Sequence, residues 1–188
     1  EKEVLIKLLS DCKSLVPQYC RINRLFRDIP SNLIISGNKS TNLRQEIHSY
    51  MQENNKRCKC IRCREVKGEK DSELKLKITK YKTPVSEEFF LEYITKENKL
   101  AGFLRLSIFK DKTSILVDSQ AMVRELHIYG TALNLKSTSK ISKQHSGLGT
   151  RLLLEAEKIA KKNKSKEIAV ISAIGTREYY RKRGFKEG

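Results

Sequence analysis

The sequence has no tryptophan, only three prolines and few aromatic residues. It also lacks any apolar run of about 18 residues, the length that a membrane-spanning helix needs, so no such helix is expected. No basic segment followed by a short apolar core marks a secretory signal, and we therefore expect a cytoplasmic protein. Acidic residues are scarce as well: 22 Asp and Glu stand against 39 Lys and Arg, a net charge of +17.

What is present suits a small globular protein. A chain of 188 residues, 38% of them hydrophobic, allows one domain with an appendage. A strong positive charge attracts polyanions, which favours nucleic-acid binding. The same charge also arises when lysines cover every solvated face, and composition does not separate these two interpretations.

Five cysteines, an odd number, argue against a disulfide scaffold. Cys58, Cys60 and Cys63 form a C-x-C-x₂-C pattern, a thiolate triplet that suits tetrahedral zinc with a fourth ligand from elsewhere. Three reduced surface thiols or an iron–sulfur cluster remain alternatives. The sequence does not choose among the candidates for a fourth ligand, which are Cys12, Cys20 and His48.

Hydrophobic periodicity predicts helices near both ends of the chain and a mostly antiparallel sheet between them. The expected helices cover residues 1–14, 41–53, 150–162 and 176–183. The expected strands cover residues 19–25, 74–79, 88–93, 100–108, 123–129 and 168–172, the last as a buried central strand.

A glycine-containing segment, residues 144–150, opens the third helix with the sequence Gln-His-Ser-Gly-Leu-Gly-Thr. Two glycines allow the backbone to approach a ligand closely. The positive end of the following helix favours an anion such as a pyrophosphate. The third glycine of a dinucleotide-binding fingerprint is missing, because Leu152 stands at that position. A lone Gly-x-Gly is weak evidence, so its context matters.

That context resembles the GNAT acetyltransferase fold, an α+β fold with a mixed, mostly antiparallel sheet flanked by helices. Antiparallel strands precede Gln-x-x-Gly-x-Gly at the start of a long helix, and an apolar strand and a short helix with Tyr179 and Tyr180 follow. The resemblance implies acetyl-CoA as cofactor and a tyrosine that protonates the departing CoA thiolate; core packing by one ring is the alternative. The implied cofactor-binding residues are Glu125, Leu126, His127, Ile128, Gln144, Gly147, Leu148, Gly149, Thr150 and Tyr180.

Further segments make the resemblance more specific. They are Arg-Asp-Ile-Pro at 27–30, Asn-Leu-Arg at 42–44, Cys-Arg-Glu-Val at 63–66, Val-Arg-Glu-Leu-His-Ile-Tyr-Gly at 123–130, the 144–149 loop and Tyr-Tyr-Arg-Lys-Arg-Gly-Phe at 179–185. In this order they resemble the family of Elongator catalytic subunits, which are tRNA wobble-uridine acetyltransferases. The cysteine-rich segment is similar to archaeal or bacterial members.

The resemblance implies a division of the chain and of its chemistry. Residues 1–72 would be a linker, or the end of a radical-SAM region, with a structural zinc at its cysteines, and residues 73–188 a GNAT domain. S-adenosylmethionine and an iron–sulfur cluster would belong to a radical-SAM domain whose cysteine signature is not found here, so we expect a C-terminal fragment. Together the two domains would form 5-carboxymethyluridine in tRNA, and the fragment alone would be limited to binding or hydrolysing acetyl-CoA.

Two other functions remain open: a protein lysine acetyltransferase, and a zinc-containing tRNA-binding module without catalysis. For tRNA contacts we expect arginines that flank the region between the two domains, namely Arg21, Arg24, Arg44 and Arg64.

Overall fold

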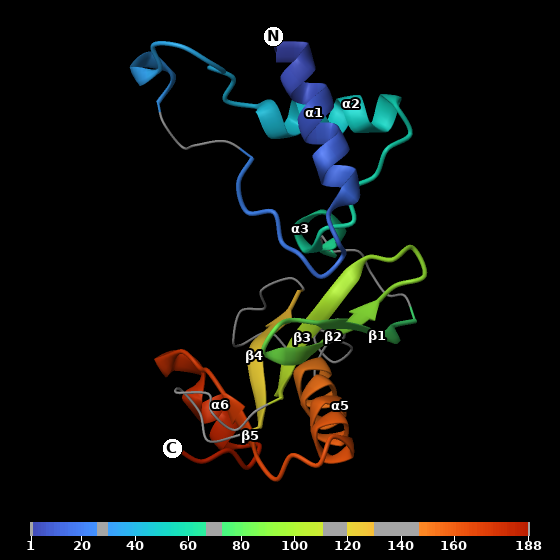
Figure 1. Ribbon diagram of the computed structural model, residues 1–188, viewed down its shortest axis with the longest axis vertical. Helices are drawn as coiled ribbons and strands as arrows, with labels where there is room; N and C mark the ends of the chain where they lie inside the picture. The colour runs from blue at the N-terminus through green and yellow to red at the C-terminus, as the bar shows by residue number, and fades with distance from the viewer. Residues whose placement is uncertain (1, 26–29, 67–72, 111–119, 130–146, 188) are drawn as a thin grey trace, which may run out of the picture. The chain divides into compact units, whose positions relative to one another are not determined.

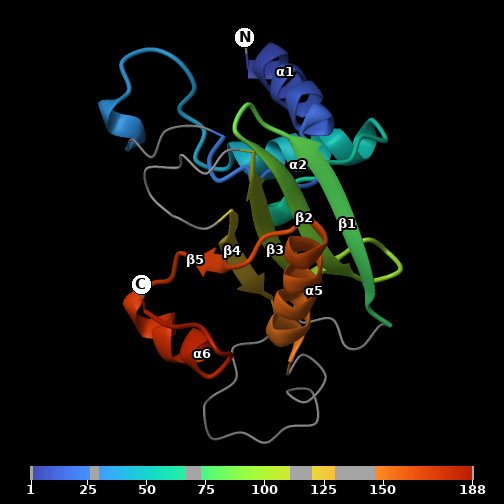
Figure 2. The ribbon, with the colours of Figure 1, turned by 60° about the horizontal axis from the view of Figure 1, so that its bottom comes forward.

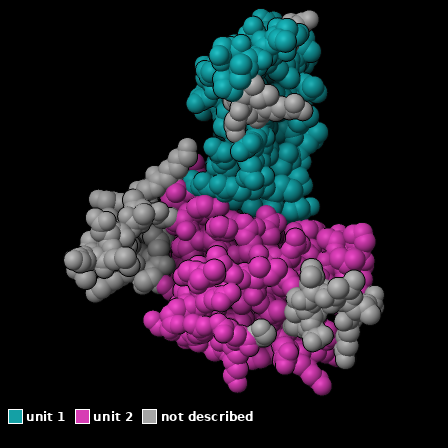
Figure 3. Space-filling view, turned by 90° about the vertical axis from the view of Figure 1, so that its left-hand side faces the viewer, with its two compact units in different colours: residues 1–65 teal, residues 66–188 magenta. Residues whose placement is uncertain are grey.

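The computed structural model describes residues 2–25, 30–66, 73–110, 120–129 and 147–187 (Figure 1). The chain divides into two compact units, Glu1–Glu65 and Val66–Gly188, which Figure 3 distinguishes by colour and which are described separately. The predicted boundary after residue 72 falls at the end of a segment outside the described residues. None of the described helices has the length and apolar character needed to cross a membrane.

The N-terminal unit contains two main helices. Helix α1 spans Lys2–Leu15 and α2 spans Leu43–Glu53, while a 3₁₀ turn, η1 (Ser31–Leu33), and a single helical turn, α3 (Ile61–Arg64), complete the unit. The apolar pattern at i, i+4, i+7 and i+8 predicted α2, and of its residues Leu43, Ile47 and Met51 are buried whereas Tyr50 is partly exposed. Its residues form a small core with apolar side chains of α1; the members are Leu43, Ile47 and Met51 with Leu5, Ile6 and Leu9.

The strand predicted at residues 19–25 is wrong, because these residues form no strand in the structure. An extended segment needs hydrogen-bond partners for its carbonyl groups, and here arginine side chains and one backbone N–H supply them. Arg44 and Arg62 both donate to the carbonyl of Asn23, at 3.1 and 2.8 Å. The N–H of Ile61 donates to the carbonyl of Cys20 at 2.9 Å. An alternating pattern without a neighbouring strand therefore stays irregular.

The C-terminal unit contains one five-stranded mixed sheet in the order β1-β2-β3-β4-β5. The first four strands pair in antiparallel fashion, as predicted, and β5 joins β4 in parallel. The α+β class is thus confirmed. The strands are β1 (Lys75–Lys82), β2 (Ser86–Ile94), β3 (Leu100–Phe109), β4 (Ala121–Ile128) and β5 (Ile168–Val170).

Helix α5 (Leu148–Lys162) covers one face of this sheet (Figure 2). Its buried residues Leu152, Leu153 and Ala156 pack on apolar side chains of β2, β3 and β4, as the periodicity predicted. A 3₁₀ turn, η2 (Ile174–Thr176), and the short helix α6 (Arg177–Arg181) follow β5. These last elements bring the two tyrosines of α6 into the same unit as the start of α5.

The apolar segment at residues 168–172 was predicted to be a buried central strand, and this prediction is wrong. The segment contributes β5, the last strand of the described sheet. It is only three residues long, and Ile171, just beyond it, is 68% exposed. A parallel strand is buried on both faces only where other elements cover it. Because β5 has one strand neighbour among the described residues, its apolar sequence does not make it central.

Candidate functional site

Strands β4 and β5 pair over a short distance and then stop pairing. In the described residues their parallel pairing covers Ala121–Val123, and the N–H of Ile171 reaches the carbonyl of Val123 at 3.4 Å. Directly after this point the register between β3 and β4 shifts, leaving Arg124 without an opposite residue. Such a bulge bends a strand and increases its twist, and bulges are frequent next to binding sites. Four predicted cofactor-binding residues follow the bulge: Glu125, Leu126, His127 and Ile128.

The side chains of this part of β4 alternate between the two faces of the sheet. The carboxylate of Glu125 accepts a hydrogen bond from Nε of Arg105 at 2.7 Å. Nε2 of His127 lies 3.1 Å from the other carboxylate oxygen of Glu125. Glu125 and His127 therefore share one face of the sheet. Leu126 packs against the core on the α5 side. Because the four side chains point to two faces, what they offer in common to a ligand is their backbone.

The N-terminus of α5 begins at a glycine in a left-handed conformation. Gly147 is the N-cap and has φ = +94°, a value that side chains disfavour. Its carbonyl accepts the N–H of Arg151 at 2.8 Å, which closes the first turn. The first N–H groups of a helix have no acceptor within the helix and are available to an anion. Gln144, the remaining predicted residue of this loop, lies outside the described residues.

Tyr179 meets the start of α5 at Gly149. A Cβ atom placed on Gly149 would overlap the Tyr179 hydroxyl oxygen and would lie 3.8 Å from Cγ1 of Ile128. The guanidinium of Arg183 stacks on the Tyr179 ring at 3.5 Å and donates to Oγ1 of Thr150 at 2.9 Å. The structure thus joins three predicted site residues, Tyr179, Gly149 and Ile128, and adds Arg183. Arg183 was not among the site residues predicted from the sequence. Its position four residues after Tyr179 indicates that the two side chains can be neighbours.

Tyr180 points elsewhere. It is 9% exposed and packs edge-on against the rings of Tyr179 and Phe185, with centroids 5.2 and 5.6 Å away. Burial, and secondarily Tyr179, raise the pKa of Tyr180, so its hydroxyl stays protonated at neutral pH.

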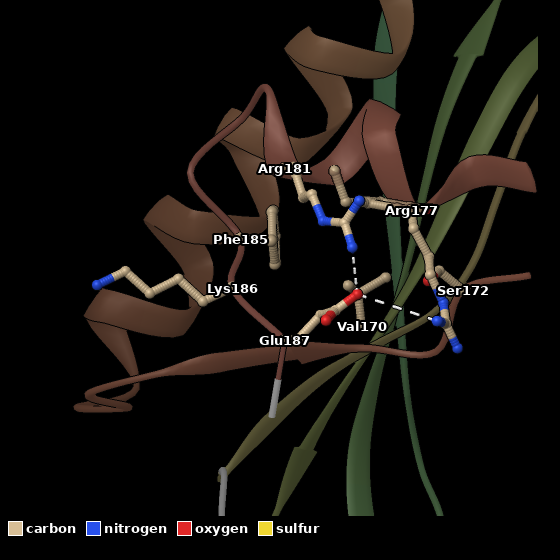
Figure 4. Close-up of a pocket in the computed structure, with 8 residues that line it drawn as sticks. Val170, Ser172, Arg177, Arg181, Phe185, Lys186 and Glu187 are labelled. Atoms are coloured by element: carbon tan, nitrogen blue, oxygen red, sulfur yellow. Dashed lines mark hydrogen bonds and ion pairs between the residues drawn. The ribbon is translucent and has the colours of Figure 1, made fainter. Parts of the chain in front are cut away.

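Tyr180 also lines a cavity of about 380 Å³ beside β5 and α6. Figure 4 shows the carboxylate of Glu187 between the guanidinium groups of Arg177 and Arg181, with which it forms ion pairs. The charged side chains that line the cavity, Arg177, Arg181, Lys186 and Glu187, are three cations and one carboxylate, so the lining keeps a net positive charge. The other lining residues are Val170, Ser172 and Phe185.

In the N-terminal unit, the three clustered cysteines converge as predicted. The sulfur atoms of Cys58, Cys60 and Cys63 lie within 4.8 Å of one another, a group that could hold a metal ion. Hydrogen bonds from Cys58 and then Cys63 lower the pKa of Cys60, whereas those with Cys58 and then Cys60 raise the pKa of Cys63. Sulfurs this close do not all ionise readily without a cation to hold them together.

His48, on α2, is the candidate for the fourth ligand that approaches this group. Its Nε2 lies 3.7 Å from Sγ of Cys63. With zinc bonds of about 2.3 Å to sulfur and about 2.0 Å to nitrogen, the sulfur-to-nitrogen edge of a tetrahedral site is about 3.5 Å long. Among the described residues, Cys12 and Cys20 lie outside the sulfur group. A cysteine triplet with one imidazole therefore fits zinc.

Of the four arginines predicted to contact tRNA, Arg21, Arg44 and Arg64 have contacts shown within the N-terminal unit. Arg21 pairs with Glu65, and Arg44 donates to the loop carbonyls described above. Arg64 is only 4% exposed, and it donates to the carbonyls of Lys59 and Gln18, both at 3.0 Å. In this conformation Arg64 cannot reach a phosphate, whereas Arg24 is exposed.

Comparisons with known proteins agree over nearly the whole chain. Residues 1–53 match the model of the Radical_SAM C-terminal domain. The tRNA uridine(34) acetyltransferase of Methanocaldococcus jannaschii is 41% identical, over 98% of this chain and 36% of its own length. The protein of the same name from Dehalococcoides mccartyi is 38% identical, over 95% of this chain and 41% of its own. Elongator complex protein 3 of Schizosaccharomyces pombe is also 38% identical, over 96% of this chain and 35% of its own length.

A solved structure supports the same relationship. The Methanocaldococcus infernus Elp3 with an N-terminal deletion superposes with a TM-score of 0.85 at 38% identity, over all of this chain and 47% of that one. The chain spans less than half the length of the relatives named here. Over nearly all of its residues, it belongs to the family of the tRNA uridine(34) acetyltransferases and Elongator complex protein 3.

Proposed function

We propose that residues 66–188 form a GNAT-type domain that binds acetyl-CoA. The observation that carries this proposal is the place where β4 leaves β5, after the bulge at Arg124 and next to the glycine-opened start of α5. A gap between parallel strands exposes backbone hydrogen-bonding groups, and an adjacent helix N-terminus attracts a pyrophosphate. A nucleotide thioester needs both features, one for its amide-rich arm and one for its phosphates.

Individual residues then have separate tasks. The N–H groups from Gly147 to Thr150 hold the pyrophosphate, and the backbone of residues 125–128 binds the pantetheine arm. The hydroxyl of Tyr179 lies beside Gly149 in this pyrophosphate-binding segment, residues 147–150, and therefore contributes to binding. Tyr180, which is protonated and lines the cavity beside the end of β5, is the better candidate to donate a proton to the departing thiolate.

We further propose that the chain provides this domain to a tRNA uridine(34) acetyltransferase, the name that its relatives carry. C5 of uridine is a carbon centre and not an amine nucleophile, so acetyl transfer to it requires additional chemistry. A radical-SAM domain would supply this chemistry with S-adenosylmethionine and an iron–sulfur cluster, and 5-carboxymethyluridine would be the product. Residues 1–53, which match a domain from such enzymes, support this assignment.

A structural zinc completes the N-terminal unit in this proposal. Cys58, Cys60 and Cys63 with His48 would hold the ion, which stabilises a segment whose own core is small. For tRNA contacts we retain Arg21, Arg24 and Arg44, and omit Arg64 because it is buried among backbone carbonyls.

Calorimetric titration with acetyl-CoA, with and without tRNA, tests the central proposal. We expect one molecule of acetyl-CoA per chain, and competition by CoA but not by adenosine, which lacks the pyrophosphate and the pantetheine arm. Absence of binding by the folded chain, both alone and with tRNA, would contradict it.

A further inference from the structure

Lys13 is buried in the N-terminal unit, although lysine is seldom fully buried. Its side chain is 1% exposed and is among the largest fully buried side chains of the described residues. An ammonium group removed from water requires an anionic partner, because its hydration is lost. The partner that the structure shows is Sγ of Cys63, 3.9 Å from Nζ.

Three carboxylates in the described part of this unit have other cationic partners. Asp11, on the same helix, pairs with Lys56. Glu46 pairs with Lys2 at 2.9 Å, and Glu65 with Arg21. The contact that the structure shows for the Lys13 ammonium is the sulfur of Cys63, which compensates the charge only as a negative thiolate.

A zinc ion in the cluster would make it negative. Three thiolates and one neutral imidazole around Zn²⁺ leave a net charge of −1, which one ammonium neutralises. We propose that Lys13 is a positioning residue of the metal centre: it donates a hydrogen bond to the zinc-bound thiolate of Cys63 and balances the charge of the site without binding the ion. This inference rests on the metal site proposed above and assigns a new role to a residue outside the ligand set.

The proposal predicts different effects of Lys13 in the two states of the protein. With zinc bound, the Lys13 ammonium would face a zinc-bound thiolate, 3.9 Å away in this structure, and would stabilise the fold. Without zinc that zinc-bound thiolate is absent, so Lys13 contributes less to the fold. Lys13→Met keeps the apolar length of the side chain and removes the charge. It should lower the melting temperature of the zinc-loaded chain by more than that of the zinc-free chain.

The experiment compares the full chain with three variants, Lys13→Met, Lys13→Arg and Lys7→Met, the last an exposed lysine of the same helix. Zinc affinity is measured by competition with a chromophoric chelator, and melting with and without zinc. We expect Lys13→Met to weaken zinc binding about 10- to 100-fold, the usual effect of losing a partner of a metal ligand. Lys13→Arg should restore most of the affinity, and Lys7→Met should match the wild type.

Different failures identify different errors. If the wild-type chain binds no zinc, the metal site itself is wrong, and the role of Lys13 with it. If the wild type binds zinc and folded Lys13→Met binds it equally well, the role of Lys13 is wrong and the metal site stands. Should Lys13→Met not fold, Lys13→Gln, which keeps a donor but not the charge, is measured against the same two outcomes. A loss of melting temperature that is equal with and without zinc would show a packing role only.

Discussion

At Gly149 the hydrogen atom that stands in place of a side chain leaves room for the Tyr179 hydroxyl group. Arg183 holds that tyrosine from the other side, stacked on its ring and bonded to Thr150. A small residue, an aromatic hydroxyl and a guanidinium therefore depend on one another at the start of α5. Neighbouring Tyr180 is buried and lines the cavity beside β5 and α6, so the two adjacent tyrosines have different environments.

Replacing Gly149 with alanine tests the proposed pyrophosphate-binding segment, residues 147–150. The added methyl group must displace the Tyr179 hydroxyl, which is the movable end of a side chain, so we expect the fold to survive with a change in stability below about 1 kcal/mol. Acetyl-CoA affinity should fall at least about tenfold, or about 1.4 kcal/mol. Gly175→Ala is the matched control because a Cβ there meets nothing within 4 Å. Equal affinity of the two folded variants in calorimetry would contradict the assignment.

Phenylalanine replacements separate the two tyrosines, since each keeps the ring and removes the hydroxyl. Tyr179→Phe should weaken acetyl-CoA binding by roughly the worth of one hydrogen bond, about 1 kcal/mol or several-fold. Tyr180→Phe should leave binding nearly unchanged and slow the release of free CoA thiol about 100-fold, as loss of a general acid does. Calorimetry gives the first quantity and a thiol assay the second. The reverse pattern would exchange the two roles.

At the scale of elements, the N-terminal unit is held together by side-chain contacts more than by strand pairing. Arg44, Arg62 and Arg64 donate to backbone carbonyls of neighbouring irregular segments, and α3 is a single turn that begins after Cys60. One turn of helix is not stable by itself. The cysteine cluster around it is therefore expected to supply much of its order.

Replacing Cys60 with serine should remove this support. Wild-type chain should carry about one zinc ion, and the variant clearly less, because Cys60 is a fully buried member of the triplet. Amide hydrogen exchange should accelerate across residues 57–65. Exchange in α5, which belongs to the other unit, should be unchanged. Elemental analysis and exchange mass spectrometry measure these effects, and equal zinc contents in the two proteins would refute the site.

At the scale of the whole molecule, the charge of +17 is distributed over both units. Some of it has a structural use, as the arginines around residues 18–24 demonstrate. Under the proposed function, the remainder would attract a polyanion such as tRNA. Because charge attracts any nucleic acid, the dependence on salt and on nucleic-acid type is what distinguishes a tRNA site.

A salt series with tRNA and duplex DNA tests this point. For about six phosphate contacts, tRNA affinity should fall on the order of a thousandfold between 50 and 200 mM salt. Folded tRNA should bind more tightly than DNA, since RNA is recognised by its shape and unpaired bases. Changing Arg21, Arg24 and Arg44 together to alanine should reduce the slope of log affinity against log salt by up to about three.

The control for this series is Arg62→Ala. Arg62 also donates a hydrogen bond to the Asn23 carbonyl but is not among the arginines proposed to contact tRNA. This variant should leave the salt slope nearly unchanged. If the triple variant and the control behave alike, or if tRNA and DNA bind equally, the three arginines are structural and the charge has no specific partner.

Much of the C-terminal fold was predictable because it is encoded by short-range patterns. Alternating side chains at residues 74–79 and 88–93 predicted β1 and β2, and the stripe of Leu152, Leu153 and Ala156 predicted α5. The cysteine triplet was predictable for the same reason, since its spacing alone brings the sulfurs together. In each case the deciding residues lie within a few positions of one another.

Only the tertiary structure decided features that depend on distant neighbours. The alternating residues 19–25 found arginines instead of a partner strand, and the apolar β5 came to lie at one side of the described sheet. The approach of His48 and Lys13 to Cys63 joins residues 15 and 50 positions apart. Local periodicity determines which face of a segment is apolar. Which partner covers that face, or balances a buried charge, depends on the packing of the whole chain.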